Sequence, residues 1–306
     1  MPALRAWGVH WVAEPRESIR ILCPAKVNLH LRVLGRRSDG YHDILTLMQP
    51  VGLWDELELQ LAGSGITLSC SEPGVPNDQG NLAYRAALRF QKRVGEPKGV
   101  QIRLRKRIPV GAGLGGGSSD AAGVLKGLNE LMGAPLDQEE LRVMAAELGA
   151  DVPFFLHGGP AIATGIGERL EPVRLRVSLY YVLWFPGWSV STGWAYRNLD
   201  LGLTTPSKKT KIAQLIEGFE DVIALLHNDL ETVTARHHPW IQKAKERLRN
   251  AGAEGVLMSG SGPTVFGLFR QEEEARLSLE KLSAAKGEFL CWSRGEPGSG
   301  GDAQAR

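Results

Sequence analysis

The segment Pro109-Val-Gly-Ala-Gly-Leu-Gly-Gly-Gly-Ser-Ser-Asp120 is the strongest local signal in the chain. It places five glycines within seven positions, directly before an Ala- and Leu-rich stretch that predicts a helix running toward Leu131. Glycine lets the backbone turn its N–H groups inward, and a helix start adds partial positive charge. The segment therefore predicts a phosphate-binding loop, with Ser118 or Ser119 as the helix N-cap. For the glycines alone, a flexible connection remains the alternative.

Neither of two familiar nucleotide loops fits this segment. Three of its glycines formally satisfy the G-x-G-x-x-G pattern of dinucleotide-binding proteins, but that pattern needs a buried parallel strand before the loop. The preceding strand, 100–108, is instead half covered by arginines. The dinucleotide-binding pattern also needs an acidic residue at the end of a second strand, about 20 residues later. At that distance this chain has Asp137, which instead begins a predicted helix. A Walker A loop requires a lysine before the hydroxyl residue, and Ser118 follows Gly117 directly. The segment is a third kind of nucleotide loop.

Outward from the loop, strands and helices are mixed without regular alternation, which favours an α+β fold over a doubly wound parallel sheet. Short branched or alternating apolar stretches predict strands over 19–23, 27–34, 45–61, 100–108, 256–258 and 265–269, with a turn at 24–26. Apolar residues at helical spacing and glycine stop signals predict helices over 81–94, 138–148 and 271–285. We expect an N-terminal extension 1–18, an ATP-binding domain 19–170, a second domain 171–294 and a disordered tail 295–306.

The amino-acid composition argues against several classes of protein. The 306 residues are 43% hydrophobic and 23% charged, with a formal net charge of +2, so a normal core is expected without a general attraction to nucleic acid or membranes. Three widely spaced cysteines indicate a reducing compartment and argue against both a disulfide framework and a cysteine zinc site. The longest apolar stretch, 179–185, is far shorter than the about 20 residues that span a bilayer. The expected protein is cytoplasmic, with no nucleic-acid, membrane or obligate protein partner.

Three further features are candidates for chemistry. Lys26 lies in the predicted turn and reads in isolation as an ordinary exposed lysine. Ser38-Asp-Gly-Tyr-His42 is a turn signature, either a plain hairpin loop or a substrate loop with a stacking ring and a donor–acceptor pair. Asp151 follows a helix stop and precedes a proline, so it suits a helix N-cap and also a general base. The pair His237-His238 has no neighbours at metal-ligand spacing and predicts no metal site.

Taken in order, five segments resemble the GHMP kinase superfamily: Pro24-Ala-Lys-Val-Asn-Leu29, Asp39-Gly-Tyr-His42, Pro109 to Asp120, Leu148-Gly-Ala-Asp-Val-Pro-Phe154 and Ser259-Gly-Ser-Gly-Pro-Thr264. The glycine loop is shared by many members. The segments around Lys26, Tyr41 and Asp151 are narrower, and they resemble the branch that phosphorylates the 2-hydroxyl of 4-diphosphocytidyl-2-C-methyl-D-erythritol in non-mevalonate isoprenoid biosynthesis. The resemblance runs from about residue 19 to residue 292. It implies a ribosomal-protein-S5-like N-terminal domain and a ferredoxin-like C-terminal domain.

The resemblance also implies roles for single residues. Asp151 resembles the general base and Lys26 its charged partner, with ATP and Mg²⁺ as cofactors and unassigned Mg²⁺ ligands. The implied ATP-binding residues are Asn81 and Lys106 on the adenine side, and the loop residues Pro109, Val110, Gly111, Ala112, Gly113, Leu114, Gly115, Gly116, Gly117, Ser118 and Ser119. The implied residues for the cytidine-diphosphate substrate are Asn28, Tyr41, His42 and Tyr196, with Trp194 as the alternative to Tyr196. Ala112 replaces a glycine found in many relatives, and the first 18 residues extend beyond the usual start.

Three other functions remain open at this stage. Another GHMP kinase, acting on mevalonate or homoserine, would keep the glycine loop but lack Asp39-Gly-Tyr-His42. A nicotinamide-dependent oxidoreductase would use the same glycines to bind NAD rather than ATP. A non-catalytic nucleotide-binding protein would have no need of Lys26 and Asp151.

Overall fold

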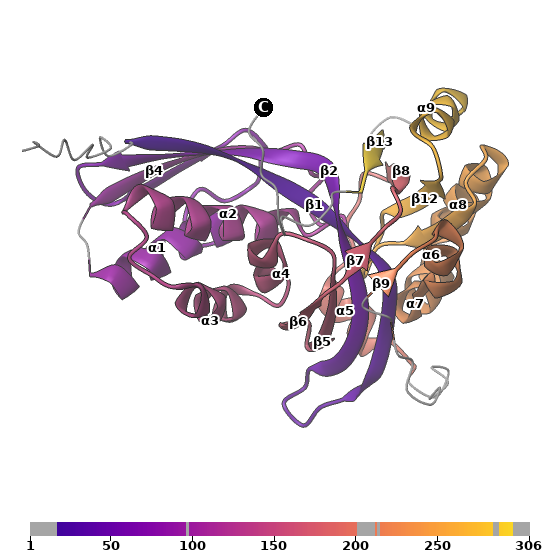
Figure 1. Ribbon diagram of the computed structural model, residues 1–306, viewed down its shortest axis with the longest axis horizontal. Helices are drawn as coiled ribbons and strands as arrows, with labels where there is room; N and C mark the ends of the chain where they lie inside the picture. The colour runs from indigo at the N-terminus through magenta and orange to yellow at the C-terminus, as the bar shows by residue number, and fades with distance from the viewer. Residues whose placement is uncertain (1–16, 96–97, 201–211, 213–214, 284–287, 296–306) are drawn as a thin grey trace, which may run out of the picture.

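The computed structural model describes residues 17–95, 98–200, 212, 215–283 and 288–295. Within these residues a seven-stranded sheet is covered on one face by a layer of helices (Figure 1). Its strands are β1 (Ser18–Arg36), β2 (His42–Ala62), β3 (Ile66–Cys70), β4 (Gly99–Arg105), β5 (Ala161–Gly165), β6 (Arg169–Pro172) and β10 (His227–Asn228). The helices of that layer are α1 (Leu82–Val94), α2 (Gly116–Leu131), α3 (Gln138–Leu148) and α4 (Val152–His157).

Two very long strands form the centre of the molecule. β1 and β2 pair antiparallel over nearly their whole length, and the hairpin that they form runs out of the helix-covered part toward the second half of the chain (Figure 1). One half of β2 pairs with β4 and the other half with β5, so the sheet changes partners along this strand. β1 also pairs in parallel with the short strand β10. The hairpin therefore belongs to both halves of the protein.

The second half is built on a four-stranded antiparallel sheet in the order β11-β12-β8-β13. These strands are β8 (Tyr180–Phe185), β11 (Gly255–Met258), β12 (Val265–Phe269) and β13 (Phe289–Arg294), and β7 (Arg174–Leu175) pairs with β9 (Leu215–Ile216) beside them. The helices of this half are α5 (Thr192–Arg197), α6 (Phe219–Leu225), α7 (Asp229–His237), α8 (Trp240–Asn250) and α9 (Glu272–Lys281). No helix of the described part is long and apolar enough to cross a membrane.

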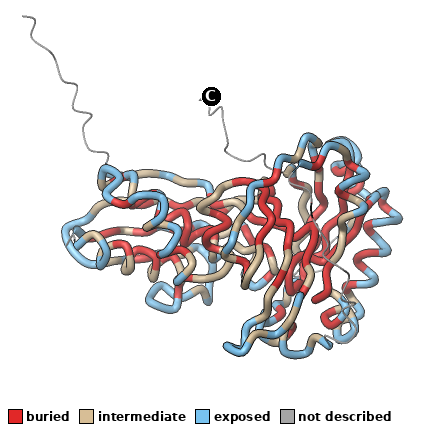
Figure 2. The backbone as a smooth tube through the Cα atoms, turned by 60° about the horizontal axis from the view of Figure 1, so that its bottom comes forward, coloured by how far each residue is buried: buried red, intermediate tan, exposed pale blue. Residues whose placement is uncertain are grey.

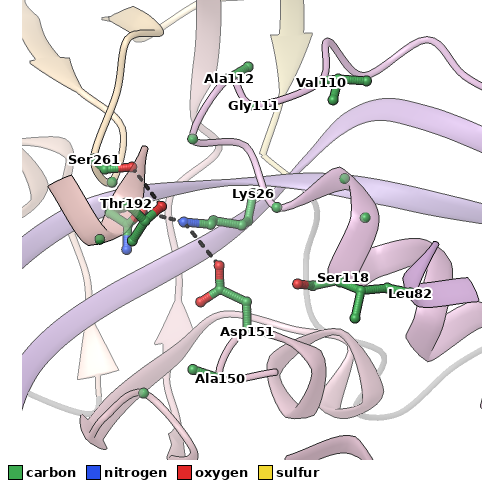
Figure 3. Close-up of a pocket in the computed structure, with 18 of the residues that line it drawn as sticks. Lys26, Leu82, Val110, Gly111, Ala112, Ser118, Ala150, Asp151, Thr192 and Ser261 are labelled. Atoms are coloured by element: carbon green, nitrogen blue, oxygen red, sulfur yellow. Dashed lines mark hydrogen bonds and ion pairs between the residues drawn. The ribbon is translucent and has the colours of Figure 1, made fainter. Parts of the chain in front are cut away.

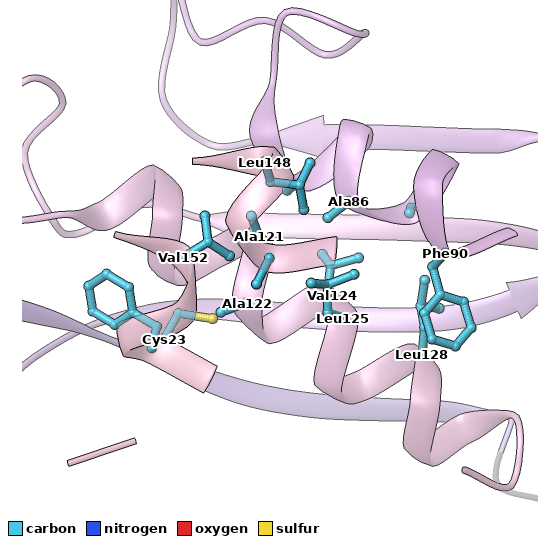
Figure 4. Close-up of a cluster of buried hydrophobic side chains, with 14 of the residues drawn as sticks. Cys23, Ala86, Phe90, Ala121, Ala122, Val124, Leu125, Leu128, Leu148 and Val152 are labelled. Carbon is cyan, nitrogen blue, oxygen red and sulfur yellow. The ribbon is translucent and has the colours of Figure 1, made fainter. Parts of the chain in front are cut away.

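Buried residues occupy the interior of both halves (Figure 2) and form three hydrophobic clusters. In the N-terminal half, α2 packs its small and branched residues against α1 and the central strands (Figure 4). Two helix glycines allow this close approach: a Cβ on Gly127 would lie 2.5 Å from Ile21 Cδ1, and one on Gly123 would lie 2.6 Å from Cys23 Sγ. Further along β1, Ala25, Val27 and Leu29 belong to a second cluster shared with the C-terminal sheet. The core thus holds α2 flat on the sheet, which fixes where the helix begins.

The predicted turn at 24–26 is wrong, because β1 is one continuous strand. The pairing register shifts between Pro24 and Ala25, so the strand passes the proline through an irregularity in the ladder instead of ending there. From Ala25 to Leu31 both faces of β1 are buried. Lys26 is therefore a buried residue in mid-strand rather than an exposed turn lysine. A proline followed by a lysine is typical of turns in general, and only the contacts made by the rest of the chain override that tendency.

The predicted N-cap of α2 is also wrong. The helix begins at Gly116 and its N-cap is Gly115, whose φ of +74° lies in the left-handed region that glycine tolerates. Gly115 offers no side-chain acceptor, so the first N–H groups of the helix are left for another partner. The α+β class, the strands flanking Ser259–Thr264, the alternation of β4 and the helix end at Gly149 are confirmed. The predicted domain boundary at 170 falls inside β6 and stays a prediction, and the extension 1–18 and the tail lie almost wholly outside the described residues.

Candidate active site

A cavity of about 870 Å³ lies where the two halves of the chain meet (Figure 3). The glycine loop and the start of α2 form one side, and the middle of β1 lines the interior. The loop between β1 and β2, the start of α4, the start of α5 and the turn after β11 complete the lining. Segments far apart in the sequence therefore converge on one space. Its size suits a small organic ligand that is largely enclosed.

The glycine loop presents backbone N–H groups to this cavity. Gly111, Gly113 and Gly115 all have positive φ, which lets the chain coil tightly before α2. The first hydrogen bond of the helix runs from Ser119 N to Gly115 O at 2.9 Å, so the N–H groups of Gly116, Gly117 and Ser118 precede the intrahelical ladder. Unbonded N–H groups at a helix N-terminus attract anions, and phosphate in particular.

The turn Ser259–Thr264, one of the five segments that carry the family resemblance, holds the glycine loop in place. Ser259 donates its hydroxyl to Gly113 O at 3.1 Å, and Thr264 N donates to Ala112 O at 3.3 Å. From the other side, Lys26 N donates to Leu114 O at 2.9 Å. Both halves of the protein thus hold the loop through hydrogen bonds to its carbonyl oxygens, and these contacts use none of its N–H groups.

Lys26 and Asp151, whose proximity the spacing did not show, lie together in the cavity (Figure 3). Lys26 Nζ is 3.6 Å from Asp151 Oδ2 and donates a 2.6 Å hydrogen bond to Asn28 Oδ1. Asn28 in turn donates to Thr46 Oγ1 at 2.9 Å, which orients the amide. The lysine side chain is 5% exposed, whereas the aspartate side chain is 37% exposed. The ammonium is therefore fixed, and the carboxylate stands open to a ligand.

Asp151 occupies the N-cap position of α4 but makes no capping hydrogen bond with its side chain. The sequence allowed both an N-cap and a general base, and here the carboxylate faces the lysine instead of its own helix. A carboxylate beside an ammonium at the edge of a cavity suits the removal of a proton from a bound hydroxyl group.

An aromatic group lines the opposite end of the cavity. The rings of His42 and Tyr196 are stacked with centroids 5.2 Å apart, and Tyr41 beside them is 60% exposed. Burial lowers the pKa of His42, with the nearby charge of Arg36 adding to the effect, so the imidazole is neutral at pH 7 and offers one donor and one acceptor. Burial and the charge of Asp151 raise the pKa of the Tyr196 phenol, which keeps its proton. Trp194 packs edge-on against His237, outside the cavity lining.

Two arginines that the sequence analysis did not single out line the same end. Arg36 lies at the end of β1 and Arg197 at the end of α5, and both face the cavity. Neither has an acidic partner at ion-pair distance within the described residues. Thr192 and Ser261 also line the cavity, beside Lys26 (Figure 3), and their hydroxyl groups lie 3.0 Å apart. Exposed arginines are common on hairpins and helix ends, so the sequence held no signal that these two meet.

Asn81 and Lys106, the two residues predicted for the adenine side, line the cavity, and their polar groups are hydrogen-bonded or ion-paired to other residues of the protein. Asn81 caps α1 by accepting from Ala83 N at 2.9 Å, and its amide donates to Pro76 O at 2.9 Å. Lys106 forms ion pairs with Asp55 and Asp120. The sequence analysis missed the residues that accompany them in the lining, which are Gly74, Val75, Pro76, Gly80, Leu82 and Leu104. Apolar side chains and open backbone suit a flat heterocycle. The adenine roles of Asn81 and Lys106 stay predictions.

Two predicted loop residues do not reach the cavity. Leu114 is buried in the cluster shared with the C-terminal sheet, and Ser119 is 2% exposed with a buried hydroxyl. The hydroxyl-bearing residue that lines the cavity is Ser118. Within the described part of the chain, no group of three or more His, Cys, Asp or Glu residues is placed to hold a metal ion.

Comparison with known proteins agrees with this geometry. A family model described as GHMP kinases N terminal domain matches residues 81–159, and one described as GHMP kinases C terminal matches residues 212–288. Over 276 residues the chain is 49% identical to 4-diphosphocytidyl-2-C-methyl-D-erythritol kinase of Citrifermentans bemidjiense, which covers 90% of this chain and 98% of the relative.

Solved structures show the same relationship. A crystal structure of 4-(cytidine 5'-diphospho)-2C-methyl-D-erythritol kinase has a TM-score of 0.76 at 40% identity, covering 91% of this chain and 100% of that chain. Homoserine kinase from Cytophaga hutchinsonii has a TM-score of 0.73 at 22% identity over 94% of this chain and 98% of its own, and shares the fold alone. The predicted two-domain α+β kinase fold, with its S5-like and ferredoxin-like parts, is confirmed. The chain therefore belongs to the GHMP kinase superfamily and, within it, to the family of 4-diphosphocytidyl-2-C-methyl-D-erythritol kinases.

Proposed function

We propose that the chain transfers the γ-phosphoryl group of ATP to the 2-hydroxyl of 4-diphosphocytidyl-2-C-methyl-D-erythritol, giving the 2-phosphate and ADP in non-mevalonate isoprenoid biosynthesis. The observation that carries this proposal is the position of the Lys26–Asp151 pair, which lies in one cavity with the phosphate-binding glycine loop and the aromatic group. Family membership supplies the substrate, because relatives that match almost the whole chain are named for it.

The transfer itself needs one proton movement and one exchange of bonds to phosphorus. Asp151 takes the proton of the 2-hydroxyl as the hydroxyl oxygen bonds to the γ-phosphorus, and the bond to the bridging oxygen breaks to release ADP. Lys26 keeps its ammonium beside Asp151 and, in this proposal, beside the transferring group, where it offsets the developing negative charge. Its hydrogen bond to Asn28 fixes that charge before substrates bind.

The glycine loop supplies the binding of the triphosphate. The free N–H groups at the start of α2 would bond to the phosphate oxygens, and the carbonyl contacts from Ser259, Thr264 and Lys26 hold the loop in that conformation. Mg²⁺ would neutralise charge on the phosphates when bound.

The opposite end of the cavity would bind the acceptor. We assign the cytosine to the exposed ring of Tyr41 and the ring of Tyr196, with the neutral His42 reading the polar edge of the base. Arg36 and Arg197 would pair with the diphosphate, because they are cations in the lining without acidic partners in the described structure. An enzyme that uses ATP and a nucleotide-linked alcohol needs no nucleic-acid, membrane or protein partner, and we place it in the cytoplasm.

The test is a measurement of ADP release from ATP and Mg²⁺ with three acceptors in turn: 4-diphosphocytidyl-2-C-methyl-D-erythritol, mevalonate and homoserine. We expect turnover with the first alone. Asp151→Asn keeps the size of the side chain but cannot accept the proton, so its kcat should fall by about 10²–10⁴-fold. ATP binding by calorimetry should stay within about threefold, because the carboxylate lies off the glycine loop.

Other outcomes would change the assignment. Turnover with mevalonate or homoserine would move the activity elsewhere in the superfamily. Retention of full activity by Asp151→Asn would remove the general base from the mechanism. Binding of ATP without turnover on any of these acceptors would leave a nucleotide-binding protein, and binding of NAD instead of ATP would favour an oxidoreductase.

A further inference from the structure

A cluster of three buried charged residues lies directly behind the glycine loop. Its members come from three elements: Asp55 on β2, Lys106 just after β4, and Asp120 in the first turns of α2. Their side chains are 0%, 6% and 3% exposed, respectively. Lys106 Nζ pairs with Asp55 Oδ2 and donates to Asp120 Oδ2 at 2.7 Å. The lysine therefore bridges the sheet and the helix that carries the phosphate-binding N–H groups.

Asp55 makes contacts that Asp120 does not. Its second oxygen, Oδ1, accepts the backbone N–H groups of Arg107 at 2.6 Å and Ile108 at 2.9 Å. These are the last two residues before Pro109, where the glycine loop begins. One carboxylate thus fixes both the ammonium of Lys106 and the direction in which the chain enters the loop. In contrast, the Asp120 side chain, which belongs to the cavity lining, accepts a hydrogen bond only from Lys106 among the described residues, and its Oδ1 is buried without a hydrogen-bond partner.

The ammonium of Lys106 lies beside the start of α2. A Cβ placed on Gly116 would be 3.2 Å from Lys106 Nζ and 3.0 Å from a methyl carbon of Ile108. Gly116 is the first residue of the helix, so its N–H belongs to the group that the helix leaves unbonded. Two of the three residues that Asp55 holds, Lys106 and Ile108, therefore lie against the phosphate-binding end of α2. A shift of either one moves the surface on which an anion would rest.

We infer that Asp55 is a positioning residue for the nucleotide, acting through Lys106 and the start of the glycine loop. The inference rests on the proposed function for the identity of the ligand as ATP. Asp55 is fully buried and is not part of the cavity lining, so it touches no ligand itself. Its three hydrogen bonds set the loop conformation before ATP arrives, and a site that is organised in advance loses less free energy on binding.

The experiment compares Asp55→Asn with Asp120→Asn, which is a matched control in the same cluster with the same chemical change. In Asp55→Asn one end of the amide becomes a donor, and it must face either the ammonium of Lys106 or the two backbone N–H groups. We expect the Kd for ADP, measured by calorimetry, to rise at least about tenfold, which corresponds to about 1.4 kcal/mol. In Asp120→Asn the amide oxygen can still accept from Lys106, and the Kd should change by less than about threefold.

Steady-state kinetics separate positioning from general damage. Asp55→Asn should raise the KM for ATP while the KM for the acceptor and kcat stay within about threefold, since the Lys26–Asp151 pair makes no contact with the cluster. Equal ADP affinity in Asp55→Asn and the wild type would overturn the inference. So would a parallel loss of affinity for both substrates, which would indicate a merely structural role.

A second variant and the choice of ADP as the ligand keep the experiment decisive. If Asp55→Asn does not fold, the double variant Asp55→Leu/Lys106→Met removes the carboxylate and the ammonium together and is compared with Lys106→Met alone. Its Kd for ADP should be at least about fivefold higher than that of Lys106→Met, because the backbone N–H groups of Arg107 and Ile108 lose their acceptor. Equal ADP affinity in these two folded variants would overturn the inference. ADP binding is measured without acceptor, so a failure of the proposed phosphorylation reaction would leave this comparison readable on its own.

Discussion

Asp120 is a buried carboxyl group whose protonation should make the stability of the protein depend on pH. Burial, with the nearby charge of Asp55 adding to it, raises the pKa of Asp120 from 3.8 to about 7, although Lys106 acts in the opposite direction. A raised pKa means that the folded state keeps a proton that the unfolded chain loses. The contribution of this proton to the free energy of unfolding is fully present below pH 3.8 and is lost as the pH rises to about 7.

Asp120→Asn removes this dependence because the amide does not titrate. Relative to the wild type, the variant should gain free energy of unfolding as the pH rises from about 4 to about 7 and then stay level. Denaturant melts of both proteins at several values of pH would measure the difference, in which other titrating groups cancel. A difference that stays constant over this range would show that Asp120 ionises normally.

Some residues of the candidate site were expected from the sequence and others were not. The structure places Lys26, Asp151 and His42 in the lining of one cavity, but their proximity was expected only from the family resemblance, since 125 positions separate the first two. Asp55, Arg36 and Arg197 had no signal at all. A lone acidic or basic residue in a strand or helix is usually a solvated one, and only tertiary contacts distinguish the buried or convergent cases.

At the scale of elements, the contact between the glycine loop and the turn Ser259–Thr264 should be sensitive to one methyl group. Gly113 has φ of +77°, and a Cβ there would lie 2.5 Å from Ser259 O and 2.9 Å from Gly262 O. Gly113→Ala should therefore lower the free energy of unfolding by about 1–2 kcal/mol for the backbone conformation. Overpacking against two fixed backbone oxygens should add about 1–3 kcal/mol.

Gly117→Ala is the matched control for that substitution. Gly117 has an ordinary helical backbone, and the nearest atom to its Cβ would be Leu82 Cδ1 at 3.8 Å. Alanine in a helix is favoured over glycine by roughly 0.5–1 kcal/mol, so this variant should be as stable as the wild type or more so. Thermal melts of the two variants should move in opposite directions. Equal melting temperatures would mean that the loop is not pressed against the turn.

Most elements followed from periodicity, and the two errors share a cause. The turn at 24–26 and the serine N-cap of α2 were both expected from local residue preferences. In the structure, pairing with β2 carries β1 past Pro24, and a left-handed Gly115 replaces the side-chain cap. Both exceptions lie at the active site. Local preferences fail there because the site needs a buried lysine and unbonded N–H groups, which a regular turn and a capped helix would not provide.

At the scale of the whole molecule, the contribution of one strand, β1, to all three buried clusters predicts a single cooperative unfolding transition. β1 contributes Cys23 to the N-terminal cluster, Val27 to the middle one and Val33 to the C-terminal one. Because one strand contributes to all three clusters, unfolding of one half would remove buried contacts from the other half. Far-ultraviolet circular dichroism and tryptophan fluorescence should therefore give coincident thermal transitions.

Phe90→Ala provides the test of that coupling. Phe90 is fully buried between α1 and α2, and its truncation should cost about 3–5 kcal/mol. Five of the eight tryptophans, in contrast, belong to the C-terminal cluster, where Trp184 is fully buried, so they dominate the fluorescence signal. If the halves are coupled, the transition reported by the tryptophans falls in step with the one reported by circular dichroism. A fluorescence transition that stays at its wild-type temperature would show that the two halves unfold separately.

The long hairpin of β1 and β2 also bears on how such an enzyme diversifies. Lys26 and Asn28 lie in the middle of β1, where buried neighbours hold the strand on both faces, whereas Tyr41 lies in the exposed connection beyond Arg36. The residues proposed for phosphoryl transfer and those proposed to recognise the acceptor thus lie at different points along one pair of strands. Substitutions in the connection can accumulate without altering the strand register that aims the lysine. Selection for a new alcohol can therefore act on a few exposed positions while the inherited chemistry stays intact.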